Sequence, residues 1–346
     1  MNNSNFLKAL RLEKNTVPPI WFMRQAGRYL PEYQKIRKNY KNFLDMCKEP
    51  RTCAELALQP IERFDLDASI LFSDILTIPD AFNLGLAFHE GEGPKFSNPI
   101  SSAQDISNLE RFEIEKLNYV FKAVEETKKI LPATLPLIGF CGSPWTLAAY
   151  SIEGGGSKDF MKTKKFMNEN PESLKDYLDI LSDACFEYLK QQVLSGVNAL
   201  QIFDSWADLL KPEDLETYSL HYTRKLTRRL SEDPITSSIP IILFEKAPKK
   251  GISDIVFDAL SCVSLHWQDD IKTVSSNLKN EFAVQGNLNP ALLLESDEII
   301  WNETQKICQI MNNFPGFIFN LGHGITPDIK PEKVQVMIDA VRTERL

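Results

Sequence analysis

Eight short apolar runs, separated by segments of helical periodicity, constrain this chain most. The runs are rich in β-branched and aromatic residues and are apolar throughout, which is typical of strands buried on both faces of a parallel sheet. In the segments between them, such as residues 174–189, apolar side chains recur every three or four positions and predict helices. The eight predicted strands are residues 19–22, 68–72, 136–140, 199–203, 240–244, 262–267, 281–285 and 316–320.

Strands that alternate with helices in this way predict an α/β fold, and we expect a single (β/α)8 TIM-type barrel spanning residues 1–346. The alternative is an open doubly wound sheet, but no G-x-G-x-x-G motif follows the first run to support a dinucleotide-binding fold. Residues 83–99 are rich in glycine and predict a hairpin inserted after the second strand. No linker divides the chain, so we expect one domain.

In such barrels the active-site cleft lies at the carboxyl ends of the strands. Each predicted strand is followed there by polar or charged residues, any one of which could instead be a loop residue or a helix cap. That alternative is at least as good for Ser143, Asp204 and Asn287. The strand-end residues are Arg24, Gln25, Ser73, Asp74, 141–143, Asp204, Ser205, Glu245, Lys246, 266–268, Asn287 and 322–324.

The net charge of −8 argues against nucleic acid as a partner, because phosphate binding requires a basic surface. Six arginines and lysines nevertheless gather between residues 24 and 41. They indicate either a local anion site or a solvated basic helix face.

Residues 1–14 lack the basic and then apolar pattern of a signal peptide, and no apolar run is long enough to cross a bilayer. The six cysteines are scattered without a C-x-x-C pair, so neither a disulfide framework nor a zinc site is predicted. We therefore expect a cytoplasmic protein without a membrane partner.

Two long motifs resemble the uroporphyrinogen decarboxylases: PIWFMRQAGRYLPEY at residues 19–33 and GFCGSPWTLAAY at residues 139–150. The shorter pieces LFSDIL (71–76), QIFDSWA (201–207), QGNL (285–288) and NLGHGI (320–325) are similar to the same family, so the resemblance spans almost the whole chain. The departures from the family pattern are Glu245, residues 248–251, His266 and Asn289.

The resemblance implies a cytoplasmic carboxy-lyase of haem biosynthesis that converts uroporphyrinogen III to coproporphyrinogen III and CO2. It also implies a homodimer that uses no metal or organic cofactor. The catalytic residues that it implies are Asp74, Arg24, Arg28 and Tyr150. The substrate-binding residues that it implies are Arg24, Gln25, Arg28, Arg37, Asp74, Tyr150, Phe203, Ser205 and His323.

The chemistry of these residue types suits an octacarboxylate ring with four pyrrole N–H groups. Arginine forks can bind acetate and propionate groups in a bidentate manner, although Arg28 could instead form a helix-surface ion pair. The lone carboxylate of Asp74 could accept several pyrrole N–H groups together, or it could cap the following helix. His323 in its Gly-His-Gly turn is either a propionate ligand or a structural residue.

The proton donor stays open among Arg24, Tyr150, His323 and Asp74. Two other functions compete with decarboxylation. A corrinoid-dependent methyltransferase would need zinc ligands with His-x-Cys spacing, and none of the four histidines has that spacing. A non-catalytic tetrapyrrole carrier could keep the same pocket without the chemistry.

Overall fold

The structure is a computed structural model that describes residues 4–89, 93–246, 259–278 and 281–343, so residues 248–251 lie outside the described residues. The strands are β1 (Ser69–Ile70), β2 (Leu86–His89), β3 (Gly93–Phe96), β4 (Leu137–Gly142), β5 (Ala199–Asp204), β6 (Ile241–Glu245), β7 (Cys262–Ser264), β8 (Ala283–Leu288) and β9 (Phe317–Leu321).

The α-helices are α1 (Asn5–Leu10), α2 (Pro31–Arg37), α3 (Phe43–Cys47), α4 (Pro50–Arg63), α5 (Thr77–Asp80), α6 (Ala103–Ser107), α7 (Asn118–Ile130), α8 (Pro144–Glu153), α9 (Met161–Glu169), α10 (Pro171–Ser195), α11 (Pro212–Leu215), α12 (His221–Glu232), α13 (Ile271–Asn277), α14 (Asp297–Ile310) and α15 (Pro331–Arg342). The shorter turns are η1 (Ile114–Leu117), η2 (Ala207–Leu209), the π-helix η3 (Glu216–Leu220) and η5 (Pro290–Leu294).

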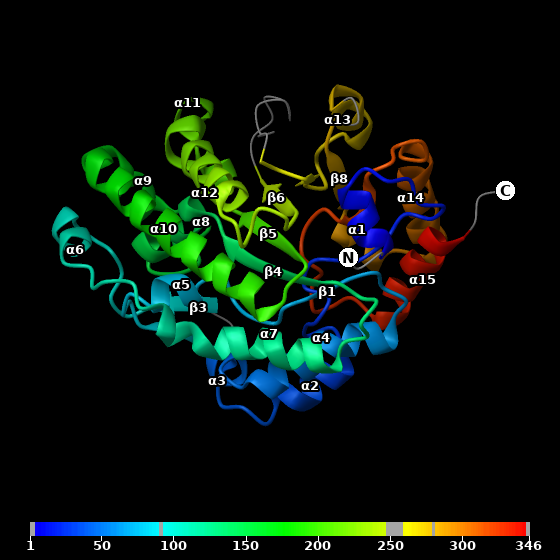
Figure 1. Cartoon of the computed structure of the whole chain (residues 1–346), viewed down its shortest axis with the longest axis horizontal. Coiled ribbons are helices and arrows are strands. Elements are labelled where there is room, and N and C mark those ends of the chain that lie inside the picture. The colour runs from blue at the N-terminus through cyan, green and yellow to red at the C-terminus, as the bar shows by residue number, and fades with distance from the viewer. Residues whose placement is uncertain (1–3, 90–92, 247–258, 279–280, 344–346) are drawn as a thin grey trace.

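Seven parallel strands form one curled sheet in the order β1-β4-β5-β6-β7-β8-β9, and helices surround it (Figure 1). Every residue of β4 and of β8 is buried, as expected for strands covered on both faces. Parallel neighbours need a crossover between them, which the helices supply. The prediction of a TIM-barrel-like α/β fold is confirmed.

The segment 19–22 takes the eighth place in this ring without forming a regular strand. Ile20 makes a parallel bridge to Phe319 of β9. On its other side, the carbonyl oxygen of Ile20 accepts a hydrogen bond of 2.8 Å from the N–H of Asp67, just before β1. The first predicted strand is therefore reduced to a bridge that connects the last strand with the first.

The predicted hairpin within 83–99 is confirmed, because β2 and β3 pair in antiparallel register. It stands apart from the main sheet, and Lys95 of β3 makes an isolated bridge to Gly155 beyond α8. The hairpin thereby contacts the loop that follows α8, just after the motif at residues 139–150.

The barrel interior is built in layers, because alternate residues of each strand point inward. At the amino-terminal end, Phe6 and Leu10 of α1 pack with Ile242 and other inward residues in one buried cluster. Above them lies a polar layer in which Trp21 Nε1 donates to Gln285 Oε1 at 2.7 Å. Gln285 Nε2 donates in turn to Ser264 Oγ and Gln201 Oε1, at 2.9 and 3.3 Å. Because these buried groups bond one another, the layer avoids most of the desolvation cost.

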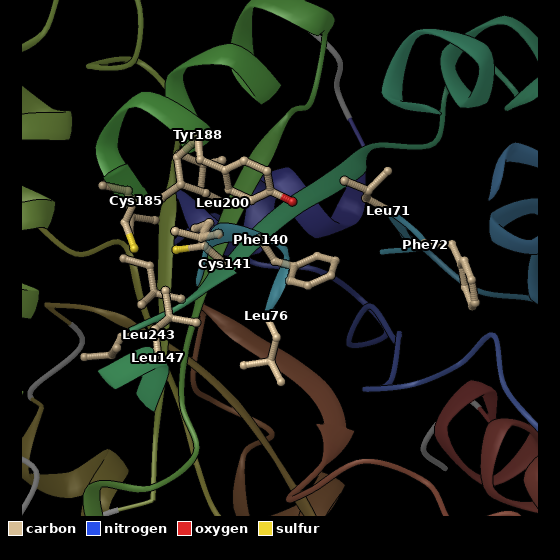
Figure 2. Packing of buried hydrophobic residues seen from close by; sticks show 14 of the residues in the cluster. Leu71, Phe72, Leu76, Phe140, Cys141, Leu147, Cys185, Tyr188, Leu200 and Leu243 are labelled. Atoms are coloured by element: carbon tan, nitrogen blue, oxygen red, sulfur yellow. The ribbon is translucent and has the colours of Figure 1, made fainter. Parts of the chain in front are cut away.

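The outward faces of the strands pack against the helices. Figure 2 shows Cys141 of β4, Leu200 of β5 and Leu243 of β6 in the same cluster as Cys185 and Tyr188 of α10. The helix spacing that the sequence predicts over residues 174–189 is confirmed by α10, whose apolar face is buried.

Close contact between β4 and α10 depends on Gly139. Gln192 of α10 brackets the Phe140 peptide, since its Oε1 accepts from the Phe140 N–H at 2.9 Å and its Nε2 donates to the Phe140 carbonyl at 3.0 Å. A methyl group on Gly139 would lie 2.5 Å from Gln192 Oε1. Only a residue without Cβ therefore leaves room for this side chain.

Candidate active site

Arg24 follows the barrel-closing segment 19–22 and is held by the other end of the chain. The N–H of Met23 donates to Asn320 Oδ1 at 3.2 Å, and the Met23 carbonyl accepts from Ile325 N–H at 3.1 Å. The side chain of Arg24 crosses Gly324, where a methyl group would lie 2.6 Å from Cδ of Arg24. Arg24 has a φ of +64°, a left-handed conformation that is uncommon outside glycine and is concentrated at functional sites.

Gln25 is buried and bonds the backbone on two sides. Its Oε1 accepts from Phe22 N–H at 3.3 Å, and its Nε2 donates to the Ala68 carbonyl at 3.2 Å. These bonds connect the barrel-closing segment to the residue before β1. Donation from Gln25 to a substrate stays a prediction.

Arg28 precedes α2, and Arg37 is the last residue of that helix. Arg28 is exposed and makes no ion pair with any residue that the structure describes, so the surface ion-pair interpretation finds no partner there. Arg37 is half-buried and donates from Nη1 to the Tyr40 carbonyl at 2.8 Å. Burial raises the pKa of Tyr33 to about 12, and the charges of Arg37 and Arg28 oppose that rise. Both guanidinium groups therefore act on the same aromatic residue.

Asp74 lies beyond the carboxyl end of β1 and is half-buried. Its Oδ1 accepts from Leu76 N–H at 2.8 Å, which closes a local turn before α5. The N-cap of α5 is Leu76 and no side chain caps this helix, so the helix-capping role considered for Asp74 is not seen. No described residue donates to Oδ2, so one oxygen is left for a ligand. Burial raises the pKa of Asp74 to about 6, while the Leu76 N–H and the charge of Arg24 oppose the rise.

Tyr150 projects from α8, whose start is fixed on β5. Ser143 caps α8 by accepting from Thr146 N–H at 3.0 Å, and its own N–H donates to the Phe203 carbonyl at 2.9 Å. The Tyr150 ring packs edge-on against Trp206, with 5.8 Å between centroids. Burial raises the pKa of the Tyr150 phenol. The charge of Asp74 adds to this rise, and the charge of Arg24 opposes it. Tyr150, Asp74 and Arg24 therefore share one electrostatic environment.

Aromatic rings form the top apolar layer of the barrel beneath these groups. Phe203 of β5 lies between Phe140 and Phe244, at centroid distances of 5.8 and 6.2 Å. Ser205, half-buried, follows two positions after Phe203 and so continues the inward series of β5.

His323 follows β9 and is half-buried against Phe244 and His266, with 6.2 Å between the ring centroids in each pair. Its pKa is lowered to about 4, first by burial and then by the charges of Arg24, His266 and Lys246. The imidazole is therefore neutral at pH 7 and would meet a substrate carboxylate as a neutral hydrogen-bond partner.

Lys246 is the residue directly after β6, and it lies outside the motifs that resemble the family. Its ammonium forms an ion pair of 2.7 Å with Asp208 and lies 5.5 Å from the centre of the Trp206 ring. Neither Lys246 nor Trp206 is among the site residues that the resemblance implies. The fold alone brings them beside Tyr150.

Several strand-end residues instead have structural contacts. Asp204 accepts from the hydroxyls of Thr146 and Ser219, and Asn287 donates to the carbonyls of His266 and Asp269. Together with the helix cap at Ser143, these contacts favour the structural interpretation considered for those positions.

Glu245 is a buried carboxyl group that faces away from the site. Inward residues of β6 belong to the interior cluster, whereas Leu243 belongs to the outer core, and Glu245 falls in the same alternating series as Leu243. In the part of the chain that the structure describes, neither oxygen of Glu245 has a hydrogen-bond partner. Burial raises its pKa well above the ordinary value, and Asp204 and Asp269 add to the rise.

Among residues 4–89, 93–246, 259–278 and 281–343, no cluster of three or more His, Cys, Asp or Glu side chains is placed to hold a metal ion. Within the same ranges, no helix has both the length and the apolar character to span a membrane. The polar side chains at the site are arginines, a lysine, a tyrosine, a neutral histidine and a carboxylate with a free oxygen. Such a set suits a polyanion that also carries N–H donors.

Comparison with known proteins gives a consistent family. The sequence model described as Uroporphyrinogen decarboxylase (URO-D) matches residues 1–344. A protein named uroporphyrinogen decarboxylase from Pseudoalteromonas atlantica is 44% identical over 342 residues, which cover 99% of this chain and 96% of the relative. One with the same name from Legionella pneumophila is 43% identical over 342 residues, covering 99% of this chain and 97% of the relative.

Solved structures support the fold at much lower identity. A methyltransferase from Methanosarcina mazei superposes with a TM-score of 0.79 over 97% of both chains at 17% identity. A B12-independent methionine synthase from a Shewanella species gives a TM-score of 0.57 over 95% of both chains at 12% identity. At these identities the likeness shows the barrel architecture alone.

Proposed function

The chain belongs to the uroporphyrinogen decarboxylase family, and on that premise we propose that it converts uroporphyrinogen III to coproporphyrinogen III by removing four acetate carboxylates as CO2. The whole chain acts as one barrel domain in this proposal, with the substrate bound at the carboxyl ends of the strands. The reaction belongs to haem and porphyrin biosynthesis.

The observation that carries this proposal is the position of Asp74. Its free oxygen shares an electrostatic environment with Arg24 and Tyr150, and the guanidinium groups of Arg28 and Arg37 lie farther along the same segment. A non-aromatic tetrapyrrole can dome so that its four N–H groups point to one side. A single carboxylate there would accept them while arginines bind the peripheral acetates and propionates.

The substrate ring supplies the electron sink that decarboxylation needs. A proton adds to the pyrrole carbon beside the acetate arm, and the ring becomes cationic. The bond to the carboxylate then breaks, its electron pair moves toward the ring, and CO2 leaves. A second proton converts the exposed methylene to a methyl group, and the ring loses the first proton. The reaction therefore needs no metal or organic cofactor.

Asp74 contributes by stabilising the cationic ring. With a pKa of about 6 it is mostly ionised at pH 7, so its negative charge is in place before the ring is protonated. Preorganised charge of this kind is usually the largest single contribution to catalysis. Phe203 adds an apolar wall, against which a departing carboxylate is less well solvated.

Four groups remain as proton donors: Arg24, Tyr150, His323 and Asp74. For Tyr150, His323 and Asp74, the pKa shifts disfavour release of a proton at pH 7. The pKa of Tyr150 is raised by burial, and that of His323 is lowered to about 4. Asp74 is protonated in only a minor fraction of molecules at that pH. A relay of the proton through water from one of these groups is compatible with all three pKa shifts.

Incubation of the purified protein with uroporphyrinogen III under reducing conditions tests the proposal directly. The expected products carry seven, six, five and finally four carboxylates, separated by chromatography after oxidation. Recovery of unchanged substrate from a folded protein that binds it would favour the carrier alternative. The planar, oxidised uroporphyrin should not react, because a flat aromatic ring cannot dome its nitrogens toward Asp74.

We also infer a cytoplasmic homodimer that needs no cofactor. The family resemblance supports all three parts. Stoichiometric metal or an organic chromophore in the active, purified protein would contradict the cofactor part.

A further inference from the structure

Lys246 lies across the barrel from Arg24. The ring runs from the Ile20 segment through β1, β4 and β5 to β6, and in the other direction through β9, β8 and β7 to β6. Four steps separate the two positions in either direction, so they are diametrically opposed. Each lies at the carboxyl end of its element, where the site is built.

The alternation of β6 directs Lys246 inward. Ile242 and Phe244 belong to the interior cluster, and Lys246 is the next residue of that series. The N–H of Lys246 donates to the Asp204 carbonyl at 3.0 Å, which extends the β5–β6 ladder to this residue. The backbone that carries the ammonium is thus as well fixed as the strand itself.

Two neighbours hold the ammonium in place. Asp208 pairs with it at 2.7 Å, with side-chain exposures of only 27% for Lys246 and 32% for Asp208. The Trp206 ring lies 5.5 Å away and is itself packed on Tyr150 and Phe160, at 5.8 and 4.5 Å between centroids. An ammonium has three donors, and Asp208 is the one carboxylate that pairs with it among the described residues, so donors are left there for a ligand.

The charge of Lys246 acts on His323 inside the site. It is one of the causes that lower the pKa of His323, together with Arg24 and His266. A lysine whose only role was an ion pair on the outside of the barrel would not act on that imidazole.

We propose, on the basis of the proposed function, that Lys246 binds a carboxylate of the tetrapyrrole on the wall opposite Arg24, while Trp206 and Asp208 position its ammonium. A ring with carboxylates on all sides, bound only by Arg24, Arg28 and Arg37, would bury its far carboxylates without a counter-charge. Such burial is costly. Lys246 supplies that charge.

Steady-state kinetics of Lys246→Met with uroporphyrinogen III test the proposal. KM is expected to rise roughly tenfold or more through the loss of a charge-assisted hydrogen bond, with kcat changed by less than about threefold. Lys129→Met is the matched control, because it removes a lysine whose ion pair of 2.6 Å with Glu126 lies on the exposed part of α7. The control should keep the wild-type KM.

The double variant Lys246→Met with Asp208→Asn separates direct binding from charge neutralisation. If Lys246 binds the substrate, the raised KM persists in the double variant. Return of KM to the wild-type value would show that Lys246 only neutralises Asp208, and would overturn the proposal. An unchanged KM in Lys246→Met alone would overturn it as well. Inactive wild-type protein would instead contradict the proposed function.

Discussion

Asp74 is a half-buried carboxyl group at the site, and Glu245 is a buried carboxyl group that faces away from it. Burial raises the pKa of both. Asp74 lies at the carboxyl ends of the strands, where the charge of Arg24 acts on it. Glu245 instead points into the layer between the sheet and the helices. Burial of a carboxyl group therefore contributes to catalysis at Asp74 and lowers the stability of the fold at Glu245. Each residue leads to a separate prediction.

Asp74→Asn should lower kcat by about 10² or more, because it removes the charge that stabilises the cationic ring and places N–H donors where an acceptor is needed. Asp74→Glu keeps the charge and should lose less. The measurement is kcat for uroporphyrinogen III, with circular dichroism to establish folding. Near-normal turnover in a folded Asp74→Asn protein would remove Asp74 from the mechanism.

Glu245→Gln should stabilise the protein at alkaline pH. A carboxyl group whose pKa is raised in the folded state contributes stability that is complete below its unfolded pKa, about 4.3, and is lost as pH rises through the folded value. Glutamine keeps the shape and cannot ionise, so the gain in unfolding free energy should be larger at about pH 8.5 than at about pH 5.

Urea unfolding at both pH values measures this gain, and Glu55→Gln, an exposed carboxylate of α4, is the control that should show no such difference. Equal effects of Glu245→Gln at the two pH values would mean that Glu245 is not a source of pH-dependent stability.

At the scale of elements, two glycines mark close approaches with different consequences. A methyl group on Gly324 meets the side chain of Arg24, which can swing away, whereas one on Gly139 meets Gln192 and Val197 in the packed layer between β4 and α10. The two substitutions to alanine therefore form a matched pair.

Gly324→Ala should weaken activity by displacing Arg24 and should leave stability nearly unchanged. Gly139→Ala should cost about 1–3 kcal/mol of stability through overpacking and disturb kinetics less. Thermal unfolding and kcat/KM, measured on both variants, check the pair. Loss of stability in Gly324→Ala with normal kcat/KM would contradict the placement of Arg24.

The strands could be predicted because burial on both faces leaves an uninterrupted apolar run, as in β4 and in the first four residues of β6. The barrel-closing segment 19–22 has the same composition but pairs through a single bridge, since its hydrogen-bond partners come from Asp67 on one side and β9 on the other. The pattern of apolar residues predicts that a segment is buried, but it does not predict how many hydrogen bonds the segment makes to neighbouring strands.

The arginines, Asp74 and Tyr150 could be predicted because they lie in long motifs. Lys246 could not be assigned to the site from the sequence, because it comes to lie opposite Arg24 only when the seven strands and the segment 19–22 close into a barrel. The contacts of Gln25 with Phe22 and Ala68 could not be predicted either, because the sequence does not distinguish a glutamine that bonds the backbone from one that faces a substrate. Local pattern indicates residue chemistry, and topology decides which residues meet.

At the scale of the whole molecule, we expect a dimer of two identical chains at micromolar concentration. A stable interface of this kind removes on the order of 1,600 Å² from solvent, and sedimentation velocity would detect it as a species of twice the chain mass. A single monomeric boundary over the micromolar range would contradict the inference.

The bridge between Ile20 and Phe319 has a consequence for how a ribosome makes this protein. The segment that carries Arg24 is synthesised 297 residues before Asn320, which fixes it together with Ile325. Nascent chains arrested before residue 317 should therefore fail to retain a porphyrinogen that the full-length chain retains. Until β9 is made, β8 and the segment 19–22 both lack their shared neighbour, so the ring of strands around the site cannot close before these residues have been synthesised.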